Sequence, residues 1–81
     1  MTKYSPIGQR LAALGLAKTV ITFAEIEDWL GFQLPRSARV YPAWWANEQS
    51  GTHSHAKGWM SAGYETRDLN LSAGKVTFVQ A

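Results

Sequence analysis

Two prolines, Pro35 and Pro42, restrict the middle of the chain more than any other feature. Proline fits the first turn of a helix but cannot continue one, and it disfavours helical backbone at the residue before it. A helix over residues 35–41 must therefore be short, and residues 43–47 can add only a second turn. The core has to be built from the segments on either side.

The first element expected is a helix over residues 6–14. Ser5 is a favourable N-cap, Pro6 fits the first helical position and Gly15 supplies a stop. The apolar side of this helix is formed by Ile7, Leu11 and Leu14. A run of β-branched residues then predicts a short strand at 18–21.

The clearest start signal is the pair Thr22 and Glu25, which matches a capping box. It predicts a second helix that ends at Gly31. Its buried face is formed by Phe23, Ile26, Trp29 and Leu30. The acidic residues Glu25, Glu27 and Asp28 are expected mostly on its solvated side.

A third helix is expected from about residue 53 to 62, followed by a β-hairpin with strands at 64–71 and 76–80. The apolar stripe of the helix is formed by Ala56, Trp59 and Met60. Its open, polar side is formed by Ser54, Lys57, Gly58 and Ser61. In the hairpin, Val76 and Phe78 share one face and are expected in the core.

This order predicts a single α+β domain over residues 1–81, a small winged-helix-like fold with three helices plus a C-terminal β-hairpin. Such helix-turn-helix relatives commonly place the last helix in the DNA major groove. Two features weaken the prediction. About twenty residues separate the second and third helices, and the hairpin loop is short, with Lys75 as its one cation.

Composition narrows the class of protein. The 81 residues include no cysteine, which excludes disulfides and cysteine-based zinc sites. No apolar run approaches the roughly 20 residues needed to span a bilayer, so a cytoplasmic protein without membrane contact is expected. A domain this small keeps little stability in reserve, which makes a homodimer compatible with the sequence.

The net charge of +2 is mild, but it is unevenly placed. Residues 33–63 carry Arg36, Arg39 and Lys57 against a single acid, Glu48. Such a basic face is the minimum needed for a polyanionic partner. The candidate nucleic-acid-binding residues are Arg36, Ser37, Arg39, Trp44, Trp45, Asn47, Ser54, His55 and Lys57.

Each residue type suits a different contact with DNA. Arg36 and Arg39 can grip a phosphate or a guanine edge, and Asn47 is the right type for adenine. Serine, histidine and lysine suit phosphates. Adjacent tryptophans point in different directions on a helix or strand, so one of them can be structural while the other is exposed for stacking.

The same residues also have structural interpretations. Either arginine could pair with Glu27 or Asp28, and Asn47 could end a turn. The pair His53 and His55 could bind zinc or iron, but no third ligand is evident, so neither a metal site, a cofactor nor an enzyme is expected. Tryptophan and arginine are also common at protein interfaces, which leaves a protein-interaction module as the alternative function.

The chain resembles a small bacterial domain family of unknown function. The resemblance rests on the pattern LPxSAR at residues 34–39, WWxN at 44–47 and the segment 56–64, preceded by FxEIExxLG at 23–31. It implies a role for the conserved motif positions Arg36, Ser37, Arg39, Trp44, Trp45 and Asn47. Some members of the family look linked to DNA handling. This chain departs from the pattern with Gly58 before Trp59 and with Tyr64 where a tryptophan is usual.

The sequence thus favours a small DNA-binding protein that contacts duplex DNA through its basic, Trp-rich middle segment and the helix that follows.

Overall fold

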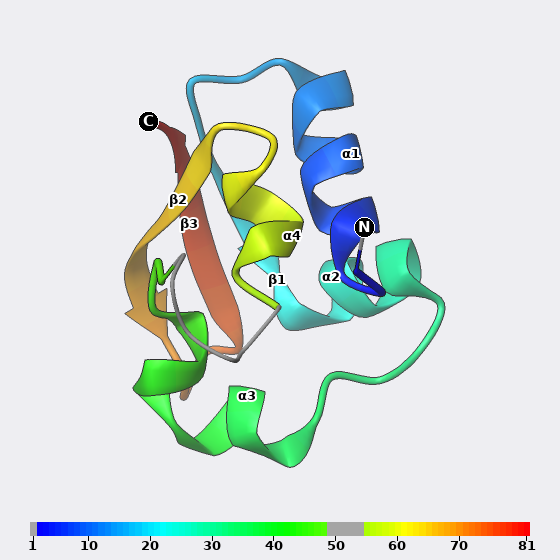
Figure 1. The fold of residues 1–81 in the computed structure, drawn as a ribbon. Helices are drawn as coiled ribbons and strands as arrows, with labels where there is room; N and C mark the ends of the chain where they lie inside the picture. Colours follow the sequence, from blue (N-terminus) through cyan, green and yellow to red (C-terminus); the bar gives the residue numbers. More distant parts are fainter. Residues whose placement is uncertain (1, 49–54) are drawn as a thin grey trace.

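The secondary structure follows the expected order, and the turn expected over residues 43–47 is a 3₁₀ helix at Pro42–Trp45. A computed structural model describes residues 2–48 and 55–81. Its elements are α1 (Ser5–Leu14), β1 (Lys18–Thr22), α2 (Phe23–Leu30), α3 (Arg36–Val40), η1 (Pro42–Trp45), α4 (Lys57–Met60), β2 (Tyr64–Asn70) and β3 (Lys75–Gln80) (Figure 1). Within the described part of the chain this is an α+β fold with four α-helices and an antiparallel sheet.

The sheet has three strands in the order β1-β3-β2. The C-terminal hairpin forms as expected, with Thr66 opposite Phe78. The N-terminal strand β1 joins the other side of β3, where Ile21 lies opposite Val76. As a result β3 is central, and Val76 and Phe78 are fully buried, which confirms their predicted place in the core.

The core lies between this sheet and the helices. In Figure 1, α4 lies in front of the sheet and α1 lies beside α4. Each helix contributes at least one fully buried residue: Ile7 and Leu11 from α1, Ile26 from α2, Ala38 from α3 and Trp59 from α4. The middle segment α3–η1 closes the lower end of the core in this view.

The cap of α2 confirms the strongest sequence signal. The Thr22 hydroxyl accepts a hydrogen bond from the Glu25 amide at 3.1 Å, and the Glu25 carboxylate accepts one from the Thr22 amide at 3.0 Å. Gly31 ends the helix with a φ of 81°, a left-handed conformation that suits glycine. The predicted N-cap of α1 is wrong, because Ser5 is already helical and its hydroxyl accepts a hydrogen bond from the Thr2 amide.

Packing of α4 against α1 corrects three further expectations. Leu14 is 49% exposed, because α4 meets α1 six residues earlier, at the buried Gly8. Gly58 is buried in this contact and does not lie on an open face. The third predicted helix is a single turn over Lys57–Met60, flanked by turns at 55–56 and 61–63, and positions 53–54 of the prediction lie outside the described residues.

Candidate functional site

Several predicted site residues surround a cleft beside α3 and η1. Two consecutive turns in this region share Tyr41 in their backbone hydrogen bonds. The Tyr41 amide donates to the Ser37 carbonyl, and the Trp44 amide donates to the Tyr41 carbonyl. This path wraps the chain around a cleft of about 300 Å³. The cleft is lined by Ser37, Tyr41, Ala43, Trp44 and His55. Three of these, Ser37, Trp44 and His55, were predicted as site residues.

Aromatic rings form the wall of the cleft. The Trp44 and His55 rings are stacked, with centroids 4.2 Å apart and an interplanar angle of 5°. Tyr4 packs edge-on against both, at 5.5 Å from Trp44 and 6.1 Å from His55. Burial raises the pKa of the Tyr4 phenol above its ordinary value. On the open side of the cleft Tyr41 is 62% exposed.

Exposed cations lie close in sequence to residues of the aromatic cleft. Arg36 in α3 directly precedes Ser37, and Lys57, the first residue of α4, follows His55 by two positions; both are exposed. Within residues 2–48 and 55–81, neither forms an ion pair with a carboxylate. The Lys3 ammonium adds a third positive charge, 5.5 Å from the Tyr4 ring centroid and 5.4 Å from that of Phe32. The surface around the cleft therefore combines aromatic rings with cations that have no acidic partner in the described part of the chain.

Arg39 has a structural role instead. Its guanidinium lies 2.8 Å from Glu27 Oε2 and 5.6 Å from the Phe23 ring centroid. The same carboxylate oxygen accepts a hydrogen bond from the Leu34 amide at 2.7 Å. This contact ties α2 to the start of α3, so the structural interpretation of Arg39 as an ion-pair residue is confirmed. The two arginines thus lie in different settings.

The ion pair makes Glu27 sensitive to pH. The hydrogen bonds from Arg39 and from the Leu34 amide lower the pKa of the Glu27 carboxyl. Because the folded pKa lies below the unfolded value of about 4.3, the stabilisation is complete above that value and is lost as pH falls through the folded pKa. The Arg39 side chain is 47% exposed, so solvent screening limits the contribution of this ion pair to the free energy of unfolding to about 1 kcal/mol.

We therefore expect Glu27→Gln to reduce the dependence of stability on pH. Urea unfolding at pH 7 and pH 3 should show a loss of unfolding free energy that is smaller in Glu27→Gln than in the wild type by about 1 kcal/mol. Asp28→Asn is the matched control, because it changes an exposed neighbouring carboxylate that forms no ion pair in the described part of the chain. Equal losses of unfolding free energy between pH 7 and pH 3 in the wild type and in Glu27→Gln would contradict the role of Glu27 in the pH dependence.

Both mid-chain tryptophans are buried, so the expectation that one is exposed is wrong. Trp44 is 9% exposed and Trp45 is 2% exposed. Trp45 stacks on Phe23 at 5.0 Å, and its indole N–H donates to the Ala38 carbonyl at 2.7 Å. The two tryptophan rings meet edge-on, with centroids 4.7 Å apart and an interplanar angle of 70°. Both belong to one core cluster, in which Trp44 packs against Tyr4 and Trp45 against Phe23.

Asn47 is also occupied inside the molecule. Its side-chain oxygen accepts hydrogen bonds from the Trp59 indole N–H at 3.0 Å and from the Thr66 amide at 2.9 Å. Its side-chain NH₂ donates to the Thr66 carbonyl at 3.2 Å. The Asn47 side chain therefore has no free donor and acceptor pair with which to bind an adenine edge. The structural interpretation of Asn47 holds, although it bridges two elements instead of ending a turn.

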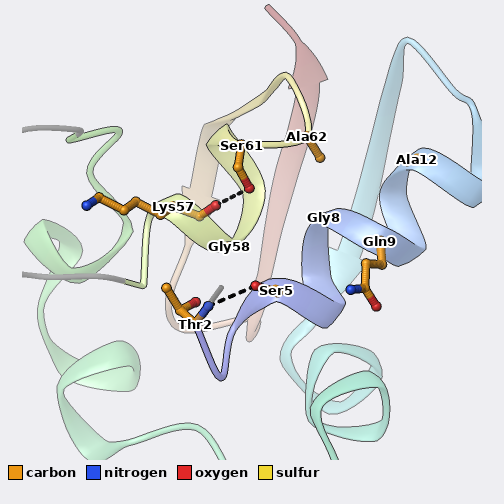
Figure 2. A pocket seen from close by; sticks show the side chains of 9 residues that line it. All are labelled: Thr2, Ser5, Gly8, Gln9, Ala12, Lys57, Gly58, Ser61 and Ala62. Carbon is orange, nitrogen blue, oxygen red and sulfur yellow. Dashed lines mark hydrogen bonds between the residues drawn. The ribbon is translucent and has the colours of Figure 1, made fainter.

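A second cavity of about 440 Å³ lies between α1 and α4. It is lined by Thr2, Ser5, Gly8, Gln9, Ala12, Lys57, Gly58, Ser61 and Ala62. Figure 2 shows that the Lys57 side chain runs away from α1, while the Ser61 hydroxyl donates to the Lys57 carbonyl. The Ser5 hydroxyl accepts a hydrogen bond from the Thr2 amide. Lys57 therefore presents its charge on the other side of α4.

Sequence reasoning missed Tyr41, Tyr4 and Phe32, and Ser54 of the predicted site lies outside the described residues. Tyr41 carried a usable signal, since it is a large aromatic residue four positions after Ser37 and directly before Pro42. No helix in residues 2–48 and 55–81 is long and apolar enough to cross a membrane. In the same residues, no three His, Cys, Asp or Glu side chains gather as metal ligands would.

Comparison with known proteins identifies the family of the chain. The family model described as Domain of unknown function (DUF7662) matches residues 4–81. The chain therefore belongs to this family. No curated protein and no solved structure matches the chain.

Proposed function

We propose that this member of the DUF7662 family is a small cytoplasmic DNA-binding protein that contacts duplex DNA through the surface formed by α3, η1 and the start of α4. One observation carries the proposal. Two exposed cations without a carboxylate partner in the described part of the chain lie close in sequence to residues that line the aromatic cleft: Arg36 directly precedes Ser37, and Lys57 follows His55 by two positions. Cations free of acidic partners are the groups that neutralise DNA phosphates. The proposed activity is binding, without a catalytic step.

The topology supports a winged-helix type by analogy. A helix and a strand precede the second helix, further helical segments follow it, and a hairpin ends the chain. Fold analogy alone does not establish function. The short α4 shifts the proposed contact surface, because a four-residue helix that buries Gly58 and Trp59 leaves mainly Lys57 for DNA. The proposed surface therefore centres on α3 and η1.

Fluorescence polarisation with a labelled random-sequence duplex tests the proposal. We expect wild-type affinity to fall steeply as salt rises, because each neutralised phosphate releases counterions. Arg36→Ala/Lys57→Ala removes two such contacts, so the slope of log K against log salt should decrease by about 2. Sedimentation of the complex at the same time gives the stoichiometry and tests the proposed homodimer.

The matched control is Arg10→Ala/Lys18→Ala. It removes the same charge from α1 and β1, away from the cleft lining. We expect this variant to show only the small loss of DNA affinity that results from its lower net charge. No binding of the wild type even at low salt, or equal losses in the two double variants, would contradict the proposed surface.

A protein-interaction module is the second candidate. It is favoured by the adjacent exposed residues Val40, 45% exposed, and Tyr41, 62% exposed, beside the cleft. Tyrosine and arginine are enriched among the residues that dominate protein interfaces. Such an interface would depend only weakly on salt, and the duplex would not bind. The polarisation experiment therefore separates the two functions.

A further inference from the structure

We propose that the cleft beside Tyr41 receives an unpaired nucleobase, so that DNA with an extrahelical base is a better ligand than a fully paired duplex. This inference rests on the proposed DNA-binding function and names the kind of DNA that suits the same site. It goes beyond phosphate contacts, which any duplex can make.

The shape of the cleft suits one flat ring. Its volume of about 300 Å³ is at the low end of small-molecule sites and is enough for a single base. The lining combines the stacked Trp44 and His55 rings with Tyr41, Ala43 and Ser37. An inserted base would therefore meet aromatic and apolar atoms.

The aromatic wall is held in place before any ligand arrives. Trp44 contacts Tyr4 edge-on at 5.5 Å, Trp45 at 4.7 Å and the stacked His55 at 4.2 Å. A ring packed from three sides keeps its orientation, so the wall does not lose conformational freedom when a base binds. Tyr41, in contrast, is exposed and is the one aromatic ring of the lining that solvent reaches freely.

Polar groups are placed to recognise a nucleotide rather than a purely apolar ligand. The half-buried Ser37 hydroxyl lines the cleft and can donate to or accept from a base edge. Arg36 and Lys57 lie on the two segments that border the cleft and suit the phosphates on either side of the inserted nucleotide. A paired base would first have to unpair and leave its stack. Unpairing and unstacking cost free energy, and this cost is smaller for a base that is already unpaired.

Two labelled duplexes test this inference in fluorescence polarisation. One is fully paired, and the other is identical except for a single unpaired adenine in one strand. We expect the wild type to bind the bulged duplex about fivefold or more tighter, since stacking on an aromatic side chain is worth at least that per base. Tyr41→Ala should abolish this preference, and Tyr41→Phe should keep it. Affinity for the paired duplex should be unchanged in both variants, because the cations remain.

Val40→Ala is the matched control, since Val40 is an exposed neighbour outside the cleft lining. Thermal unfolding followed by circular dichroism verifies that each variant is folded. Equal binding of the two duplexes by the wild type would overturn the inference and leave the proposed function intact. A preference that survives in Tyr41→Ala would overturn the assignment to this cleft. If neither duplex binds, the proposed function itself fails.

Discussion

Gly58→Ala is expected to lower the free energy of unfolding by about 3 kcal/mol or more. A Cβ at residue 58 would lie 2.4 Å from the Tyr4 carbonyl oxygen and 2.7 Å from the Tyr4 Cβ. A backbone atom cannot move aside without shifting the start of α1. Gly8 is equally confined, because its Cβ would lie 2.3 Å from the Gly58 carbonyl oxygen.

Helix propensity predicts the opposite sign for this substitution. Alanine is favoured over glycine inside a helix by about 1 kcal/mol, so an uncrowded site would be stabilised. Steric overlap with the backbone of α1 should outweigh that gain. Urea unfolding followed by tryptophan fluorescence measures the difference, and Lys57→Ala, an exposed change to the same residue type in the same helix, is the control. Unchanged stability in Gly58→Ala would mean that α1 and α4 do not pack this closely.

Asn47→Ala is expected to cost about 2–4 kcal/mol of unfolding free energy, the second largest effect. It leaves the Trp59 indole N–H and the Thr66 amide without their acceptor, and the Thr66 carbonyl without its donor. A buried polar group that loses its partner pays the full cost of desolvation. Thermal and urea unfolding measure this loss.

Two variants sharpen the interpretation of Asn47. Asn47→Asp keeps an acceptor for Trp59 and the Thr66 amide but removes the donor to the Thr66 carbonyl, so its stability should be intermediate. Glu48→Ala, at the exposed neighbouring position, should be close to wild type. A stable Asn47→Ala that has lost DNA binding would show that this residue acts at the surface, as its residue type first indicated.

These contacts divide the residues of the segments 34–39 and 44–47 into two groups. Arg39, Trp45 and Asn47 hold α2, α3, α4 and β2 together through an ion pair, a stacked ring and a bridging amide. Arg36 and Ser37 remain on the outside, beside the cleft. Substitutions in the first group should therefore lower stability first, and substitutions in the second should change binding in a folded protein.

Local features of the fold could be predicted from the sequence. The capping box of Thr22 and Glu25, the left-handed Gly31 and the short helix between Pro35 and Pro42 all depend on residues within one turn of each other. The hairpin was also predictable, because its strands are close neighbours in the chain. Backbone sterics and capping act over a few residues and need no knowledge of the rest of the molecule.

The candidate site could be predicted only in part. Ser37, Trp44 and His55 do line one cleft, but Trp45 is buried, and Arg39 and Asn47 bind partners within the molecule. Residue type did not separate the two groups, since an arginine or an asparagine can serve a phosphate or a neighbouring backbone equally well. What separated them was the identity of the nearest partner, which comes from distant parts of the chain.

The sequence by itself thus determined the order of the helices and strands, both ends of α2 and the irregular middle of the chain. Only the tertiary structure decided that β1 pairs with β3, that both adjacent tryptophans are buried, and that Gly58 lies against Tyr4. Each of these contacts joins residues remote in the chain, and the bond from Asn47 to Thr66 alone spans 19 positions. Their geometry depends on how whole elements pack, which no local pattern encodes.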